Sequence, residues 1–96
     1  MKPKTFEVGK AYELVSDSSY FSIDLQRRVK FDDGKKLVVK VSHLIYDEPG
    51  GMGYLVDVGG GPFQADYVTK NEIEFEPQDV IGEYELQGGK LYYFEW

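Results

Sequence analysis

The sequence predicts an all-β protein, a single domain over residues 1–96 that forms a small antiparallel barrel. Apolar and polar residues alternate along several short segments, as they do in strands with one buried face. Turn-forming residues recur between these segments at intervals of about 8–12 residues, which indicates roughly six to seven short strands. Along the chain we find no helical spacing of apolar residues that is sustained over an 11-residue window. At this length, a barrel closed on itself is the simplest way to bury one face of every strand.

The short elements come from brief alternating runs between glycines and prolines. The short predicted strands cover residues 6–8, 11–15, 54–58 and 72–76, and single turns are predicted at residues 17–20 and 78–81. Glycines surround the third of these strands on both sides. We interpret these glycines as turn residues and not as a phosphate cradle, because no helix with a following lysine accompanies them.

The longest predicted element is a hairpin over residues 20–45, with strands at 21–31 and 37–45 around Asp32-Asp33-Gly34. Odd-numbered positions are mostly apolar in both strands. A three-residue loop ending in glycine pairs Val29 with Leu37 and keeps the two apolar faces together. Arg27 interrupts the apolar face. His43 belongs to the same face and is therefore expected to point inward.

A second hairpin is predicted at the C-terminus, with Gly88-Gly89 as its two-residue turn. Leu86 then lies opposite Leu91, and Tyr84 opposite Tyr93. The other face of this hairpin holds the acidic and aromatic residues Glu83, Glu85, Tyr92, Phe94 and Trp96. The predicted aromatic core of the whole domain consists of Phe21, Phe31, Phe75, Tyr84 and Tyr93.

Charge is distributed unevenly along the chain. The net charge of −6 divides into about +3 over residues 1–40 and about −9 over residues 41–96, since the second part contains only Lys70 and Lys90 as basic residues. A pI near 4.7 argues against nucleic-acid binding, which needs a basic stripe to neutralise phosphates. The only basic cluster available for nucleic acid is Arg27, Arg28, Lys30, Lys35, Lys36 and Lys40.

Several classes of protein are excluded or disfavoured by composition. The chain has no cysteine, which excludes disulfides, thiol nucleophiles and cysteine-ligated metals, and favours a cytoplasmic location. No segment approaches the apolar length of a membrane span or of a signal peptide, so we expect no membrane partner. The carboxylates match no calcium loop, and we expect neither a metal nor a cofactor.

His43 is the only histidine and therefore the one candidate general base. Asp47 and Asp57 are the nearest carboxylates in sequence that could orient it, and no nucleophile is recognisable beside it. A small hydrolase built on His43 is consequently an alternative hypothesis. The preferred expectation is that the protein is not an enzyme and that His43 is dispensable.

Two segments resemble small SH3-like barrels. Residues 6–14, with Gly9-Lys10 ahead of a tyrosine-containing strand, are similar to the opening of such domains, and residues 67–77 are similar to their penultimate strands. An OB-like barrel has a comparable size. The motif of peptide-binding SH3 domains, of the ALYDY type, is absent, which argues against proline-rich ligands. The small, acidic, cysteine-free chain also resembles bacteriophage accessory proteins that bind and inhibit host machinery, and this resemblance implies the cytoplasm of the host.

The combined expectation is a protein-interaction module. It would present an acidic and aromatic surface to a protein partner with a basic surface, and would inhibit that partner in the sense of the phage resemblance. A nucleic-acid or nucleotide binder that uses the basic cluster of residues 27–40 is the alternative from a different class. The predicted partner-binding residues are Glu72, Glu74, Glu76, Glu83, Glu85, Tyr92, Phe94 and Trp96.

Overall fold

The computed structural model describes residues 6–30, 36–45, 49–57, 64–65 and 72–96. Within these residues the protein is all-β, apart from one short 3-10 turn, as the sequence predicts. The strands are β1 (Ala11–Leu14), β2 (Ser19–Ser22), β3 (Arg27–Lys30), β4 (Leu37–Leu44), β5 (Gly51–Asp57), β6 (Gln64–Ala65), β7 (Glu72–Phe75), β8 (Val80–Gln87) and β9 (Lys90–Glu95), and the 3-10 turn η1 is Pro77–Asp79. The loop Asp32-Asp33-Gly34 and Phe31 lie outside the described residues.

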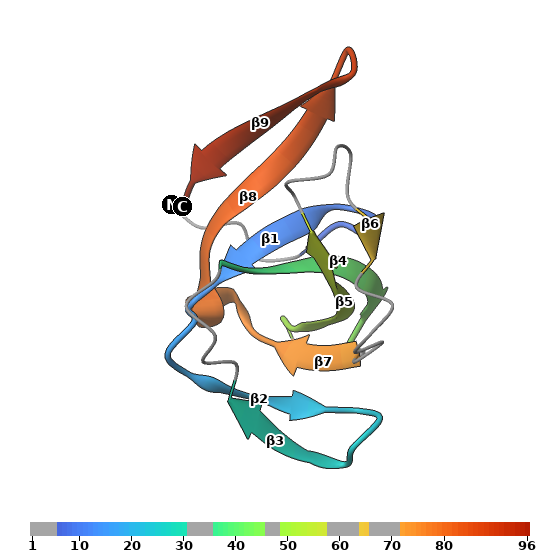
Figure 1. Cartoon of the computed structure of the whole chain (residues 1–96), viewed down its shortest axis with the longest axis vertical. Helices are drawn as coiled ribbons and strands as arrows, with labels where there is room; N and C mark the ends of the chain where they lie inside the picture. The colour runs from blue at the N-terminus through green and yellow to red at the C-terminus, as the bar shows by residue number, and fades with distance from the viewer. Residues whose placement is uncertain (1–5, 31–35, 46–48, 58–63, 66–71) are drawn as a thin grey trace.

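All strand pairings in the described part of the chain are antiparallel and belong to one curved sheet (Figure 1). The strand order is β3-β2-β7-β5-β4-β1-β8-β9, and β6 pairs with β5. The antiparallel all-β architecture is therefore confirmed. The expected number of six to seven strands is not confirmed, because nine strands are described. Closure into a barrel is not confirmed either, because the strand order has two ends, at β3 and at β9.

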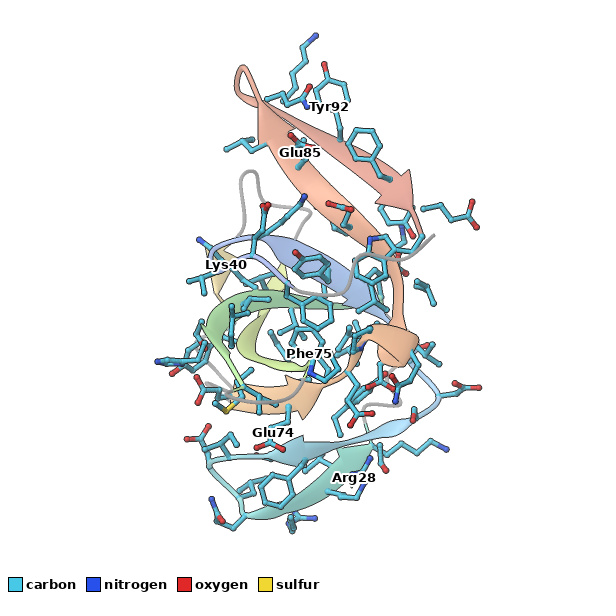
Figure 2. All side chains as sticks on the ribbon, turned by 180° about the vertical axis from the view of Figure 1, so that it is seen from behind. Arg28, Lys40, Glu74, Phe75, Glu85 and Tyr92 are labelled. Atoms are coloured by element: carbon cyan, nitrogen blue, oxygen red, sulfur yellow. The ribbon has the colours of Figure 1, made fainter. Side chains whose placement is uncertain are left out.

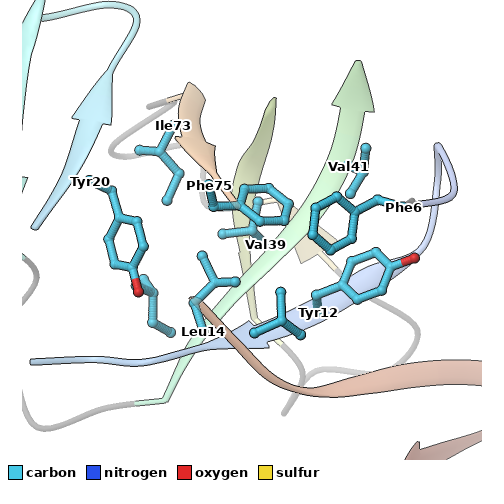
Figure 3. Close-up of a cluster of buried hydrophobic side chains, with 10 residues drawn as sticks. Phe6, Tyr12, Leu14, Tyr20, Val39, Val41, Ile73 and Phe75 are labelled. Atoms are coloured by element: carbon cyan, nitrogen blue, oxygen red, sulfur yellow. The ribbon is translucent and has the colours of Figure 1, made fainter. Parts of the chain in front are cut away.

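The core lies inside the curve of the sheet, where aromatic side chains from distant segments meet (Figure 3). The rings of Phe6 and Phe75 and those of Phe6 and Tyr12 each have centroids 4.9 Å apart. Aromatic pairs at this separation add packing energy beyond the area they bury. Phe75 and Tyr84 are buried as predicted, and Phe21 is half-buried.

The long hairpin predicted over residues 20–45 is wrong. Residues 23–26 form a turn, so that β2 and β3 pair with each other and Val29 lies opposite Tyr20. Leu37, at the start of β4, lies opposite Leu14 of β1. The turn is stabilised locally: the buried Ser22 accepts a hydrogen bond from the Leu25 N–H at its Oγ.

Gln26 completes this turn in the left-handed region, with φ of 54°, and its N–H donates to the Ser22 carbonyl. A non-glycine residue in that region is uncommon, and no glycine marks the reversal. Alternating apolar residues run straight through the turn, which explains why the sequence pattern indicated one continuous strand.

The C-terminal hairpin has the predicted register, with Leu86 opposite Leu91 and Tyr84 opposite Tyr93. Both turn glycines have positive φ, which suits the two-residue loop. In Figure 1 the hairpin of β8 and β9 projects from the body of the molecule. We call residues 80–96 the arm. Tyr93, predicted to be in the core, is 43% exposed, because β9 is the last strand in the order and no further described strand lies beside it.

Candidate protein-interaction site

The eight predicted partner-binding residues do not form one surface. Glu72, Glu74 and Glu76 belong to β7 and the residue after it, whereas the other five belong to the arm. Figure 2 shows Glu74 beside β2 and Glu85 and Tyr92 on the arm, at opposite ends of the longest axis. The two groups must therefore be considered separately.

In the β7 group, Glu72 is the centre of a polar cluster and is not a solvated rim residue. Its Oε2 accepts a hydrogen bond of 2.6 Å from the Ser42 hydroxyl and lies 3.3 Å from Nδ1 of His43. Its backbone N–H donates to Asp24 Oδ2 at 3.0 Å. The charge of Glu72 also raises the pKa of Tyr54. These contacts join β4, β7 and the turn after β2.

His43 points outward and not inward as predicted. The pairing of β4 with β5 shifts its register between Val41 and His43, so that Ser42 is the extra residue of a β-bulge. The bulge reverses the alternation and leaves the His43 side chain 64% exposed, next to a Glu72 side chain that is only 13% exposed. Asp47 lies outside the described residues, and the carboxylate beside His43 is Glu72.

This cluster differs from a catalytic triad in its geometry. The Ser42 hydroxyl hydrogen bonds to the carboxylate of Glu72 and to the Met52 carbonyl, and it also lies 3.1 Å from Nδ1 of His43, the same ring nitrogen that approaches Glu72. In a triad the histidine stands between the hydroxyl and the carboxylate. The arrangement is that of a surface network that stabilises three strands.

Glu74 and Glu76 line a recess of about 170 Å³ together with Asp79 and Arg28. The side chain of Arg28 is held by Ser19, through a 3.0 Å bond from Nε to Oγ and a 2.6 Å bond from the second guanidinium nitrogen to the carbonyl. Glu76 accepts a hydrogen bond from Gln78, and its N–H donates to Asp79 Oδ2 at 2.8 Å. This end of the molecule is thus mixed in charge, and Arg28, Glu76 and Asp79 are already hydrogen bonded.

In the arm, Glu83 and Trp96 attach the hairpin to the body. The carboxylate of Glu83 forms an ion pair with Lys10 and accepts a 3.0 Å hydrogen bond from the Trp96 indole. Partial burial lowers the pKa of Lys10, but the hydrogen bond and charge of Glu83 outweigh it and raise the pKa overall. The Trp96 ring stacks on Phe6 with a centroid distance of 5.9 Å and meets Tyr12 edge-on at 5.7 Å.

Among the described residues, no such contact involves the remaining side chains on that side of the arm, which form a surface that we call the arm face: Ile81, Glu85, Tyr92 and Phe94. The cross-strand pairs Glu83–Phe94 and Glu85–Tyr92 place acids beside aromatic rings, as predicted. Ile81, Tyr92 and Phe94 are 40%, 44% and 45% exposed. The sequence prediction omitted Ile81, although it continues the alternation of Glu83 and Glu85 and could have been found from it.

The opposite side of the arm is partly covered. The Tyr93 ring meets Tyr84 edge-on at 5.0 Å, and the Lys36 ammonium lies 5.8 Å from its centroid. A methyl group at Gly82 would overlap this ring, so glycine is required there. Burial and a hydrogen bond to Glu13 raise the pKa of Tyr93 to about 12.

The basic cluster of residues 27–40 is divided between two places, as the predicted partner-binding residues are. Arg27, Arg28 and Lys30 lie on β3 at one edge of the sheet, whereas Lys36 precedes β4 and Lys40 lies on it. Lys40 lines a recess of about 530 Å³ at the base of the arm, with Lys10 and Glu85 among the other lining residues. Arg28 and Lys40 are well separated in Figure 2. The described members thus form no continuous basic stripe.

In the described ranges, no group of three or more histidine and carboxylate side chains is arranged to hold a metal ion. None of the described segments is a helix with the length and apolar character needed to cross a membrane. No protein-family model, curated protein or solved structure matches this chain.

Proposed function

We propose that the protein is a non-enzymatic interaction module whose arm face binds a basic surface on a protein partner. The observation that carries the proposal is the projecting face of Ile81, Tyr92 and Phe94, exposed beside Glu85. Tyrosine and other aromatic side chains dominate binding energy at protein interfaces, and charges at the rim direct the encounter. Trp96 and Glu83, which are engaged with the body, would position this face instead of contacting the partner.

The acidic character of the surrounding sequence supports the choice of a basic partner. Residues 41–96 carry a net charge of about −9, which would attract a positive surface over distances up to a Debye length of about 10 Å. Glu72, Glu74 and Glu76 contribute to this field from the other end of the molecule. Inhibition of the partner, a phage origin and a cytoplasmic location belong to the same proposal and follow from the resemblance alone.

An SH3-like barrel is the fold class that we propose for the body. β1, β4, β5 and β7 form a four-stranded meander, and the chain then passes through the 3-10 turn η1 and returns as β8 to pair with β1. In this scheme β2 and β3 form a hairpin inserted between the first two strands of the barrel, and β9 is an addition at its C-terminal end.

Paired baits test the function while the partner is still unidentified. The parent protein and the variant Tyr92→Ala/Phe94→Ala are used to capture proteins from bacterial lysate, and captured proteins are quantified by mass spectrometry. Truncation of an anchor costs about 2 kcal/mol or more, so a genuine partner should bind the variant roughly thirtyfold more weakly. Leu25→Ala, which removes an exposed apolar side chain at the opposite end, is the matched control. A protein that binds all three baits equally would contradict the proposal.

Once the partner is known, charge reversal distinguishes effects on the rate of association from effects on the rate of dissociation. Glu85→Lys should slow association several-fold and reduce its dependence on salt, while dissociation changes little. Glu76→Lys, at the opposite end, is the control with the same change in net charge. Surface plasmon resonance at several salt concentrations provides both rates. A slower association with Glu76→Lys than with Glu85→Lys would place the contact near β7.

Nucleic-acid binding is the alternative function, and a gel-shift assay with the same protein tests it. Because the cations of residues 27–40 are divided between two places, we expect no shift of DNA or RNA at submicromolar protein and physiological salt. A shift that weakens steeply with salt would overturn this expectation.

A further inference from the structure

The strongest feature that the proposed function leaves unused is the free edge of β9. This strand ends the sheet, pairing only with β8 among the described residues. Its central residues are Leu91, Tyr92, Tyr93 and Phe94, with Lys90 and Glu95 only at the ends. An exposed edge of this composition is a template for another strand, and soluble proteins usually protect such edges with charges, proline or bulges.

The backbone groups on this edge can be assigned from the hairpin. Trp96 donates its N–H to the Ile81 carbonyl at 3.1 Å, which directs its backbone toward β8. Because successive residues of a strand alternate in direction, Lys90, Tyr92 and Phe94 also bond to β8. The N–H and C=O groups of Leu91, Tyr93 and Glu95 therefore point away from β8, toward the free edge.

We propose that β9 pairs with β9 of a second copy of this chain, antiparallel and centred on Tyr93. An antiparallel pairing matches outward-pointing residues with outward-pointing residues, and the register centred on Tyr93 uses all three of them in both copies. Leu91 then lies opposite Glu95 of the second copy, and Tyr92 lies opposite Phe94 of the second copy. This register places no two acidic residues opposite each other and creates three aromatic cross-strand pairs, two of Tyr92 with Phe94 and one of Tyr93 with Tyr93, which stabilise sheets.

A second copy fits this edge better than an open chain of copies would. A two-fold contact uses the same strand from both molecules and closes on itself. The other edge of the sheet would not extend the assembly, because three of the four residues of β3 are cations, Arg27, Arg28 and Lys30. Repulsion between two such strands prevents pairing at that end.

Pairing through the edge leaves the arm face available and brings two copies of it together. The faces of both arms would lie on one continuous sheet, with Tyr92 and Phe94 of each copy adjacent. This inference is independent of the proposed function, since it concerns the edge of β9 and not its face. One six-residue strand pair makes a small interface, so we expect a dissociation constant in the micromolar range.

Sedimentation velocity of the full chain, from about 1 µM to about 500 µM, measures the association directly. We expect a reversible monomer–dimer equilibrium. Amide hydrogen exchange identifies the surface: the outward N–H groups of Leu91, Tyr93 and Glu95 should gain protection as concentration rises. A protein that stays monomeric over this range would overturn the proposal. A dimer in which these amides exchange freely would also overturn it. Protection that does not depend on concentration would overturn it as well, because it would indicate that another part of the same chain covers the edge.

Proline variants isolate the backbone contribution. Tyr93→Pro removes the N–H at the centre of the pairing without removing a bond to β8 and should weaken the dimer at least about thirtyfold. Tyr93→Thr, which also loses the ring but keeps the N–H, is the matched control and should lose only a few-fold. Because Tyr93 packs on Tyr84, Glu95→Pro and Glu95→Ala form a second pair at an exposed position. Equal dimerisation by the proline and non-proline member of both pairs would contradict pairing through this edge.

Discussion

The hairpins at the two ends of the sheet differ in what they leave exposed. β3 forms one edge of the sheet and carries cationic side chains, and Tyr20 of the neighbouring strand β2 is fully buried. β8 and β9 end the other edge with Ile81, Tyr92, Tyr93 and Phe94, each at least 40% exposed. No described strand pairs with the outer side of either edge, but only the first edge carries the charges that discourage pairing. This difference is the basis of our proposal that the β8–β9 end, and not the β2–β3 end, meets other molecules.

The two hairpins are also attached differently. Tyr20 inserts its whole ring into the core, and its hydroxyl donates to the Val15 carbonyl at 2.5 Å. The arm is attached at its base by Trp96, whose ring packs on the outer part of the same core. The strand beyond Glu85 extends past β1, because the pairing of β1 with β8 begins at Ala11 and Tyr84.

Removing the anchor of the β2–β3 hairpin should have the largest effect on stability. Tyr20→Ala deletes a ring that is 2% exposed and leaves a cavity, which typically costs about 3–5 kcal/mol. Urea unfolding followed by circular dichroism measures the loss. A cost below about 1 kcal/mol would mean that this hairpin is not part of the cooperative core.

Trp96→Ala should cost less, about 2 kcal/mol, because the ring is only half-buried. Its loss also leaves Glu83 with Lys10 as its remaining partner. The expected signature is local: amides of β9 lose protection from hydrogen exchange, whereas those of β4 keep theirs. Phe94→Ala on the arm face is the control, with little change in protection. Equal effects of the two substitutions would show that Trp96 does not anchor the arm.

The hydroxyl of Tyr20 should make stability depend on alkaline pH. Burial and the nearby charges of Asp79 and Asp17 raise its pKa from 10.0 to about 12. The folded protein therefore keeps the proton that the unfolded chain releases above about pH 10, so this contribution is complete below pH 10 and is lost as pH rises toward 12. Tyr20→Phe should cost about 1 kcal/mol at pH 7.

The difference in the free energy of unfolding between the parent protein and Tyr20→Phe should become smaller between pH 10 and about 12. Thermal unfolding in a pH series measures this difference. Tyr12→Phe is a second case of the same kind and should depend on pH in the same direction, because burial also raises the pKa of Tyr12, whose hydroxyl accepts a hydrogen bond from the Glu7 N–H. A difference that stays constant across this range would show that Tyr20 ionises normally in the folded protein.

The smallest expected effect concerns His43. Nδ1 of the exposed ring lies 3.1 Å from the Ser42 hydroxyl and 3.3 Å from Glu72, and Ser42 already donates to that carboxylate. His43→Gln should change the free energy of unfolding by less than about 0.5 kcal/mol and should leave partner binding intact. Glu72→Gln, which also alters the bonds to Ser42, should cost more. Loss of function by His43→Gln in a normally folded protein would restore the hydrolase hypothesis.

The sequence predicted the arm correctly because its register depends on local signals. Gly88-Gly89 fixes the turn, and alternation fixes which residues share a face, so that Glu85 and Tyr92 were placed together. The same logic failed at Tyr93, since alternation says which side a residue faces but not whether its strand lies at the edge of the sheet, where less of the protein covers it.

The remaining errors have a common physical origin in irregular backbone without a glycine signal. The turn at residues 23–26 depends on Ser22 and on a left-handed Gln26, and the bulge at Ser42 reverses the direction of His43. Both features sit inside uninterrupted apolar alternation. The division of the acidic site could not be predicted either, because it follows from the strand order, which separates β7 from β8 by three strands.

Hydroxyl-radical footprinting tests most directly whether the β8–β9 end is the part of the molecule that meets a partner. Tagged protein is labelled in dilute buffer and in bacterial lysate, recovered through its tag, and its modified residues are quantified by mass spectrometry. The account predicts that Tyr92 and Phe94 become protected in lysate, while Leu25 and Tyr54, which are similarly exposed, do not. Protection centred on Leu25 or Tyr54, with Tyr92 and Phe94 unchanged, would contradict the assignment of the binding surface to the arm.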